Sequence, residues 1–183
     1  MNYSQPCPQI ILITGAARSG KSEWAEKLAS KTSLSVIYIA TATINPKDLE
    51  WQAKITKHQQ RRPKNWQTKV ASQELANMIK KAATSECLLI DSLGTWVANF
   101  LDLDRDDWQQ LTDELLTSLE KTQGHIILVG EETGWGVVPA YQSGRTFRDR
   151  LGHLIRQIGS MADTVYLVTG SHVLNLTLLG EPL

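Results

Sequence analysis

Gly15-Ala16-Ala17-Arg18-Ser19-Gly20-Lys21-Ser22 is the stretch that decides the fold, because it fits the phosphate-binding pattern G-x-x-x-x-G-K-[ST]. It follows the apolar run Ile10–Thr14, which predicts a buried strand, and Lys21–Ser30 continues with residues that favour a helix. In that setting the glycines let backbone N–H groups point at phosphate oxygens, and the helix N-terminus adds partial positive charge. The alternative is an accidental glycine turn, which would require neither the strand nor the helix.

This pattern, a P-loop, gives its side chains separate tasks. Lys21 is expected to bridge the β- and γ-phosphates of a nucleoside triphosphate, and the hydroxyl of Ser22 is expected to ligate Mg²⁺. The segment from Gly15 to Ser22 is therefore the first predicted nucleotide-binding site.

Around the P-loop, short β-rich runs alternate with helix-compatible stretches, which predicts an α/β fold with a mainly parallel sheet. Further strands are expected at Val36–Ala40, Trp66–Val70, Cys87–Asp91, His125–Val129 and Thr164–Thr169, the last clear strand. Further helices are expected at Asp48–His58, Gln73–Ala83 behind an N-cap at Ser72, Leu93–Leu101, Asp106–Lys121 and Thr146–Met161. No repeat or linker divides the chain, so residues 1–183 are expected to form a single P-loop NTPase-like (RecA-like) domain whose sheet is flanked by helices.

Two of the expected helices carry an apolar stripe. In the first, Leu111, Leu115 and Leu119 recur at a spacing of four residues. In the second, the stripe consists of Phe147, Leu151, Leu154 and Ile158. Stripes of this kind predict packing against the core and not a substrate surface.

Composition narrows the function. An apolar content of 42% and a charged content of 21% are ordinary for a globular protein, and the formal net charge is zero. No global field therefore favours nucleic acid or an anionic membrane. The two cysteines, Cys7 and Cys87, are far apart and form no metal-ligand pattern, and Cys87 is expected to be a small buried side chain. No basic leader precedes Ile10–Ile13, which is too short to span a membrane, so a reducing cytoplasm is the expected compartment.

A magnesium site needs a second anchor, and Leu88-Leu89-Ile90-Asp91 supplies a candidate. An apolar strand that ends in aspartate and lies next to the P-loop strand is the Walker B arrangement, in which the carboxylate holds the metal or its water. The alternative is an aspartate that only caps the following turn.

Two acidic residues, Glu131 and Glu132, follow the strand expected at His125–Val129. Loops at the carboxyl ends of parallel strands surround the ligand in open α/β folds. Carboxylates at that edge could bind metal or accept a proton from a substrate hydroxyl. A solvated glycine-rich turn explains the same residues equally well.

A basic cluster with one histidine is the fourth feature. It consists of Lys54, Lys57, His58, Arg61, Arg62 and Lys64. Such a cluster suits a polyphosphate partner. A lone histidine in a charged helix is more often a solvated surface residue, so the cluster alone does not assign catalysis to His58.

Several segments together resemble a known family, bacterial adenosylcobinamide kinase/adenosylcobinamide-phosphate guanylyltransferase, a bifunctional enzyme of cobalamin nucleotide-loop assembly. The matching pieces are Thr14–Ser22, Tyr38–Thr41, Lys54-Ile55 with His58, Arg62-Pro63 with Trp66, Leu89–Asp91, Trp96 with Asn99, Glu132-x-Gly134-x-Gly136-Val137-Val138-Pro139, Arg145-x-Phe147-Arg148-Asp149 with Gly152, and Ala162–Val168. They occur in family order over residues 9 to about 170. The P-loop is shared with many NTPases, whereas Gly-x-Gly-x-Val-Pro followed by Phe-Arg-Asp is distinctive.

The resemblance implies two reactions, with ATP and GTP as substrates and Mg²⁺ as cofactor. In the first, the hydroxyl of the cobinamide aminopropanol arm takes the γ-phosphoryl group. In the second, GTP transfers GMP to a histidine, which hands it to adenosylcobinamide phosphate. His58 matches that nucleophile, and Glu132 matches a position beside the substrate. The resemblance also implies a homotrimer and further nucleotide contacts at Ala40, Thr41, Ala42, Arg61 and Arg62.

The chain departs from the family pattern at four places. Val70 stands where relatives usually carry Glu, Ala140-Tyr141 where they carry Glu-Asn, Ile155-Arg156 where they carry Asn-Gln, and Glu131 where they carry Asn. Each change removes or alters a polar contact that could position nucleotide or corrinoid. Two rival functions therefore stay open: a P-loop kinase of another small alcohol, and a slow nucleotide-dependent switch that binds a partner.

Overall fold

The computed structural model of the protein describes residues 8–42 and 62–183. The helix expected at Asp48–His58 lies outside the described residues, and so do His58, Arg61 and Cys7. Thr41, Ala42 and Arg62 are described, and they stand at the two ends of the gap.

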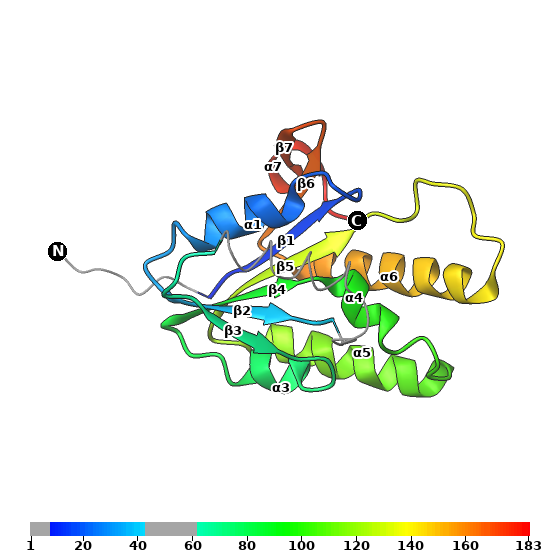
Figure 1. Cartoon of the computed structure of the whole chain (residues 1–183), viewed down its shortest axis with the longest axis horizontal. Helices are drawn as coiled ribbons and strands as arrows, with labels where there is room; N and C mark the ends of the chain where they lie inside the picture. The colour runs from blue at the N-terminus through cyan, green and yellow to red at the C-terminus, as the bar shows by residue number, and fades with distance from the viewer. Residues whose placement is uncertain (1–7, 43–61) are drawn as a thin grey trace.

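Seven strands form one sheet in the order β3-β2-β4-β5-β1-β6-β7 (Figure 1). The strands are β1 (Ile10–Gly15), β2 (Ser35–Ala40), β3 (Gln67–Val70), β4 (Glu86–Asp91), β5 (His125–Glu131), β6 (Thr164–Thr169) and β7 (His172–Asn175). Every neighbouring pair is parallel except β6 with β7. The carboxyl ends of six strands therefore meet at one edge of the sheet, where ligands bind in open α/β folds.

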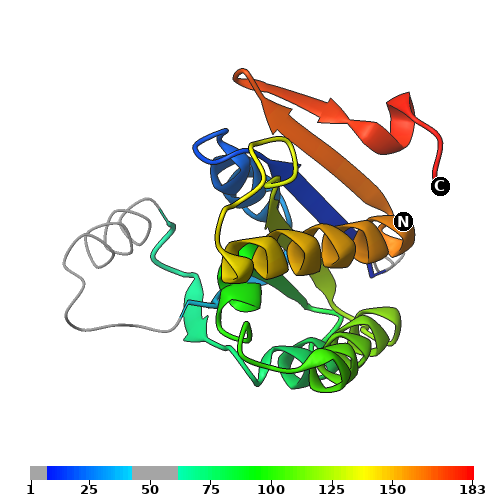
Figure 2. The same cartoon turned by 90° about the vertical axis from the view of Figure 1, so that its right-hand side faces the viewer.

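Helices cover both faces of the sheet, as a mostly parallel sheet requires (Figure 2). They are α1 (Lys21–Ala29), α3 (Leu75–Lys80), α4 (Leu93–Ala98), α5 (Arg105–Glu120), α6 (Gln142–Met161) and the short α7 (Leu176–Leu179). Helix α1 lies on one face, over β1, β4 and β5. Helices α3 to α6 form the layer on the other face.

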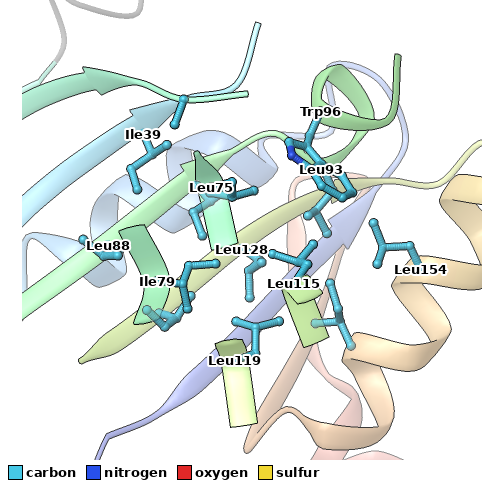
Figure 3. Close-up of a cluster of buried hydrophobic side chains, with 14 of the residues drawn as sticks. Ile39, Leu75, Ile79, Leu88, Leu93, Trp96, Leu115, Leu119, Leu128 and Leu154 are labelled. Carbon is cyan, nitrogen blue, oxygen red and sulfur yellow. The ribbon is translucent and has the colours of Figure 1, made fainter. Parts of the chain in front are cut away.

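Alternating side chains of the central strands supply a core to each layer. On β4, Leu88 and Ile90 face the layer of α3 to α6, whereas Cys87 and Leu89 face α1. Figure 3 shows the larger core, in which Leu75, Ile79, Leu115, Leu119 and Leu154 pack against strand residues such as Ile39, Leu88 and Leu128. Cys87 is fully buried as expected, and burial raises the pKa of its thiol to about 12.

Six strands lie where the sequence predicts them, and the ends of several elements differ from the prediction. Strand β5 runs two residues beyond Val129, to Glu131, and α6 begins at Gln142 instead of Thr146. Helix α4 ends at Ala98 and not at Leu101: the backbone N–H groups of Asn99 and Phe100 donate to carbonyl oxygens three residues back, at 3.1 Å each. The carbonyl oxygens of Phe100 and Leu101 accept hydrogen bonds from Arg150, at 2.8 and 3.4 Å.

The N-cap predicted at Ser72 is wrong. Helix α3 begins at Leu75 after Glu74, and no side chain caps it. The carbonyl oxygen of Ser72 instead accepts a hydrogen bond from the indole Nε1 of Trp96, at 2.9 Å, which ties this segment to α4.

Strand β7 was not expected. It returns antiparallel to β6 after Gly170 and Ser171, whose φ angles of +53° and +62° are those of a type I′ hairpin turn. In the sequence, the pair Gly170-Ser171 could have indicated a hairpin turn, but the four residues of β7 are too few to be recognised as a strand from their pattern. Over the described ranges, no helix combines the length and apolar character needed to cross a bilayer.

The two apolar stripes are buried to a similar depth. Leu115 and Leu119 are fully buried and Leu111 is half-buried; in the second stripe, Leu151, Leu154 and Ile158 are fully buried and Phe147 is half-buried. Both stripes pack against the same core, as expected.

We expect Leu154→Ala to lower the free energy of unfolding by roughly 2–5 kcal/mol, because it leaves a cavity among fully packed neighbours. Leu183, which is fully exposed, is the control, and Leu183→Ala should change stability by less than about 0.5 kcal/mol. Urea unfolding of both variants measures the difference. Equal effects in the two variants would contradict the assignment of Leu154 to the core.

Candidate active site at the carboxyl edge of the sheet

The P-loop takes the path that its glycines allow. A Cβ atom added to Gly15 would collide with the carbonyl oxygen of Val168 and lie 2.6 Å from the Ser19 hydroxyl. Gly20 has a φ of +97°, a conformation that side chains disfavour, and it stands directly before α1. The loop therefore needs glycine at both positions, as the phosphate-binding pattern requires.

Lys21 is the buried cation of this loop. Its residue is only 8% exposed, and its Nζ donates a hydrogen bond of 3.4 Å to the carbonyl oxygen of Ala16. The ammonium group thus lies across the loop, while Ala16, Ala17 and Arg18 are exposed. This is the position from which an ammonium can reach phosphate oxygens above the backbone cradle.

Asp91 stands opposite the P-loop, although its strand is not where the sequence analysis expected it. Strand β5 lies between β4 and β1, so β4 is not the neighbour of the P-loop strand. The contact forms because α1 crosses over β5 and carries Ser22 toward β4. The Ser22 hydroxyl donates to Asp91 Oδ1 at 3.3 Å.

Tyr38 holds the other oxygen of the same carboxylate. Its phenol donates to Asp91 Oδ2 at 2.9 Å from the buried face of β2. Burial, and then the charge of Asp91, raise the pKa of Tyr38 far above its ordinary value, so the phenol remains a donor.

Arg62 packs over the ring of Tyr38. Its guanidinium carbon lies 3.1 Å from the centre of the Tyr38 ring, and its Nε is 3.9 Å from Glu26 Oε1 on α1. The side chain of Arg62 is only 6% exposed. The described contacts of Arg62 are therefore with β2 and α1.

Thr41 links the ends of β2 and β4. Its hydroxyl donates to the carbonyl oxygen of Ser92 at 2.6 Å and accepts from the Ser92 backbone N–H at 3.1 Å. Its own carbonyl oxygen accepts from Asn99 Nδ2 at 2.7 Å. Of Ala40, Thr41 and Ala42, which the resemblance assigned to the nucleotide site, Thr41 thus has a clear structural role at the carboxyl ends of β2 and β4.

The side chain of Glu131 reaches into the site. From the sequence alone, Glu131 was not preferred over its neighbour Glu132. Its Oε2 accepts from the backbone N–H of Gly94 at 2.8 Å, and a side chain at Gly94 would overlap this carboxylate. Burial raises the pKa of Glu131, although a hydrogen bond from Ser92 and the charge of Lys21 partly oppose the shift. Its carboxylate therefore lies among the N-terminus of α4, Lys21 and Asp91.

Glu132 is joined to the P-loop through its backbone. Its N–H donates to the carbonyl oxygen of Gly15 at 3.0 Å. The following loop is held by α6: Arg148 donates to the carbonyl oxygen of Gly134 at 2.7 Å, and Arg145 to that of Ala140 at 2.6 Å. The segment after β5 thus lies beside the phosphate cradle.

Strand alternation explains why Glu131 and Tyr38 belong to the site. Ile127 and Val129 on β5 face α1, so Glu131, two residues on, lies on the same face. Tyr38 and Leu89 face α1 as well, and Asp91 follows Leu89 by two residues. The same alternation is present in the sequence, but it points to Glu131 only once β5 is extended to that residue.

The oxygen atoms of Ser22 and Asp91 fit a Mg²⁺ ion. Magnesium prefers hard oxygen ligands and is usually held by one or two carboxylates together with water and substrate phosphates. Within residues 8–42 and 62–183, no group of three or more His, Cys, Asp or Glu side chains is placed to hold a metal without a nucleotide.

Comparison with known families matches residues 11–176 to the family described as cobinamide kinase / cobinamide phosphate guanyltransferase. The bifunctional adenosylcobalamin biosynthesis protein CobP of Pseudomonas aeruginosa is 42% identical over 177 residues, which is 94% of this chain and 98% of that protein. The corresponding protein CobU of Escherichia coli is 36% identical over 174 residues, covering 87% of this chain and 94% of the relative.

Solved structures show similarity in fold alone. A protein from Pyrococcus horikoshii superposes with a TM-score of 0.57 at 5% identity, over 93% of this chain and 86% of the other. An ATPase of a bacterial type III secretion system gives a TM-score of 0.50 at 14% identity, over 94% of this chain and 53% of the other. These similarities support the mainly parallel P-loop NTPase fold that the sequence predicted.

We expect Glu131→Gln to stabilise the nucleotide-free protein at neutral pH. The raised pKa means that the folded state holds the Glu131 proton more tightly than the unfolded state. The stability that this proton supplies is present at acidic pH and is lost as the pH rises through the raised pKa. Glutamine keeps an oxygen for Gly94 and carries no charge, so its melting temperature should exceed the wild type's at neutral pH.

The advantage of Glu131→Gln should disappear below the ordinary pKa of a glutamate, where the wild-type side chain is also neutral. Thermal melting across pH measures the effect, and Glu120→Gln, at an exposed position at the end of α5, is the matched control. A gain that does not depend on pH would mean that burial of the Glu131 charge is not its cause.

Proposed function

The chain belongs to the cobinamide kinase / cobinamide phosphate guanyltransferase family, and we propose that it catalyses both reactions named in that description. It phosphorylates adenosylcobinamide with ATP or GTP, and it transfers GMP from GTP to adenosylcobinamide phosphate. The observation that carries the proposal is the meeting of Lys21, Ser22 and Asp91 at one edge of the sheet, in a chain that matches the family over residues 11–176. In this proposal, residues 1–183 form the single domain that catalyses both reactions.

In the kinase reaction, the γ-phosphoryl group passes from the nucleotide to the hydroxyl of the aminopropanol arm, and that hydroxyl loses its proton. Backbone N–H groups of Gly15–Ser22 bind the phosphates, and Lys21 neutralises charge on the group in transfer. Mg²⁺, bound through Ser22 and supported by Asp91, would withdraw charge from the phosphate oxygens. Glu132, beside the P-loop, accepts the proton of the substrate hydroxyl.

In the guanylyl reaction, an imidazole nitrogen of His58 attacks the α-phosphorus of GTP, and pyrophosphate leaves. The phosphate oxygen of adenosylcobinamide phosphate then attacks the same phosphorus and releases the histidine. Arg61 and Arg62 would neutralise charge on the phosphates. The support for this step is the match of His58 to the family nucleophile and the basic residues around it in the sequence. His58 and Arg61 lie outside the described residues.

The two rival functions give different results in simple assays. A kinase of another small alcohol would transfer phosphate to that alcohol and not to cobinamide. A nucleotide-dependent switch would bind GTP tightly and transfer nothing to a small acceptor. Family membership and the presence of Glu131 and Glu132 beside the P-loop favour the bifunctional enzyme.

We further propose a homotrimer in the cytoplasm, where ATP and GTP are supplied, with no nucleic acid as partner. Exposed apolar side chains support an assembly: Trp135, Val137, Val138, Leu178 and Leu179 are all more than 60% exposed.

Two of the positions that depart from the family pattern differ in their surroundings. Val70 is 57% exposed on β3, and Ile155 packs near Gly130. Changes at these positions bear on nucleotide or corrinoid specificity.

Lys21→Ala should lower kinase turnover by at least about a hundredfold, because the charge on the group in transfer loses its ammonium partner. Lys31→Ala, at an exposed position just after α1, should leave turnover unchanged. Phosphate transfer from ATP to adenosylcobinamide measures both variants, and circular dichroism checks their folding. A folded Lys21→Ala protein with wild-type activity would remove the central claim.

Asp91→Asn keeps the shape of the side chain and removes its charge. The affinity for nucleotide in the presence of Mg²⁺ should then fall toward the affinity measured in EDTA. Asp113→Asn, at an exposed position on α5, should keep the full gain from Mg²⁺. An unchanged gain in Asp91→Asn would make Asp91 a turn residue only.

Incubation with GTP and Mg²⁺ should increase the mass of the protein by one GMP unit. The bond is phosphorus to nitrogen, so the adduct should survive alkali and be lost in mild acid. His58→Ala and His58→Asn should both abolish the adduct and guanylyl transfer while sparing the kinase reaction, which needs only the P-loop and the metal.

His153, exposed on α6, is the matched control, because His153→Ala should still form the adduct. Mass spectrometry of the intact protein measures all variants. Guanylyl transfer without any adduct in the wild type would rule out the covalent mechanism, and kinase activity alone would mean that only half of the family's chemistry remains.

A further inference from the structure

Asp91 engages both of its carboxylate oxygens, and each oxygen has a different partner. Oδ1 accepts from the hydroxyl of Ser22 at 3.3 Å, on the side of the P-loop. Oδ2 accepts from the phenol of Tyr38 at 2.9 Å, on the side of β2. The carboxylate therefore presents a single oxygen to Ser22 and to whatever binds there.

Tyr38 is itself held in place on several sides. Its residue is 4% exposed within the core under α1, and β2 is paired on both edges, by β3 and β4. The guanidinium of Arg62 lies 3.1 Å from the ring centre, and Glu26 of α1 pairs with that guanidinium at 3.9 Å. A ring packed in this way cannot swing its hydroxyl away from Asp91 without disturbing the core.

From this geometry we propose that Tyr38 is a positioning residue for magnesium: its hydroxyl occupies Oδ2 of Asp91 and so directs Oδ1 alone toward the metal beside Ser22. The inference rests on the proposed metal role of Asp91. Partners that orient a ligand in this way commonly change metal affinity by about 10- to 100-fold when they are removed. Tyr38 contacts neither nucleotide nor metal in this proposal and acts through Asp91.

The chain offers a matched control in Tyr166. Its ring packs edge-on against Trp24 with the ring centres 5.7 Å apart, and in the described part of the chain its hydroxyl makes no hydrogen bond. Tyr38→Phe and Tyr166→Phe therefore remove the same atom from two half- or fully buried rings on the α1 side of the sheet. Phenylalanine keeps the packing and the Arg62 stack at position 38, so both variants should fold.

The experiment measures the affinity of a fluorescent mant-GTP in EDTA and over a range of Mg²⁺ concentrations. The variants are Tyr38→Phe, Tyr166→Phe, Asp91→Asn and the double variant of Tyr38→Phe with Asp91→Asn. We expect Tyr38→Phe to keep the affinity in EDTA and to need on the order of tenfold more Mg²⁺ for half of the gain. Tyr166→Phe should match the wild type.

The double variant shows whether Tyr38 acts through Asp91. Once Asp91→Asn has removed the charge, Tyr38→Phe should add no further loss, since coupled residues are not additive. Two results would overturn the inference alone: a wild-type Mg²⁺ dependence in Tyr38→Phe, or an equal loss from Tyr38→Phe with and without Asp91→Asn. A wild-type protein whose affinity gains nothing from Mg²⁺ would instead overturn the proposed metal role, and this inference with it.

Discussion

The structure depends on the position of α1, which leaves the end of β1 through the P-loop and crosses the sheet over β5. Strand β5 separates the P-loop strand from β4, so pairing alone would keep Ser22 and Asp91 apart. Because α1 packs on β1, β4 and β5 together, its first turn lies over the end of β4. Gly15 and Gly20 make that path possible, since side chains at either position would clash or strain the turn.

The same arrangement concentrates charge at one buried edge. Lys21, Asp91 and Glu131 are all at least partly buried there, and each is hydrogen-bonded by the surrounding backbone or by hydroxyl groups. Burying a charge lowers the stability of the folded protein unless the charge is paired, so this cluster lowers the stability of the nucleotide-free protein. The raised pKa of Glu131 is one sign of that cost, and a bound phosphate–metal pair would change the balance of charge.

Much of the fold could be predicted from the sequence because its signals are local. Apolar runs identified five strands, the short polar strand β3 was expected from Trp66–Val70, and the P-loop pattern located both the start of α1 and the cradle. Some errors concern the ends of helices: α4 closes with hydrogen bonds three residues apart after Ala98, and α3 begins at Leu75, while a long-range contact from Trp96 holds the carbonyl oxygen of Ser72. Strand order is also long-range, which is why β4 was expected beside β1.

In the site, sequence reasoning found the residues that belong to a pattern and missed those that act through a neighbour. Lys21, Ser22 and Asp91 follow from the P-loop and the Walker B strand. Tyr38 was part of the matching piece Tyr38–Thr41 but had no assigned role, because its role appears only when β2 and β4 pair and Arg62 covers its ring. Glu131 was visible as one of two adjacent acids, and the true end of β5 was needed to place it on the α1 face.

The register of β1 also has a consequence for how the chain is made. Strand β1 is near the start of the sequence, yet its two neighbours are β5 and β6, with Ile10 beside Ile126 and Ile11 beside Thr164. While the ribosome is still synthesising the first half of the chain, the strand that carries the P-loop has no partner for either edge. An apolar strand with unpaired edges can pair with other chains. The nascent chain is thus most exposed to aggregation before β5 emerges, and chaperones that hold such segments would matter most in that interval.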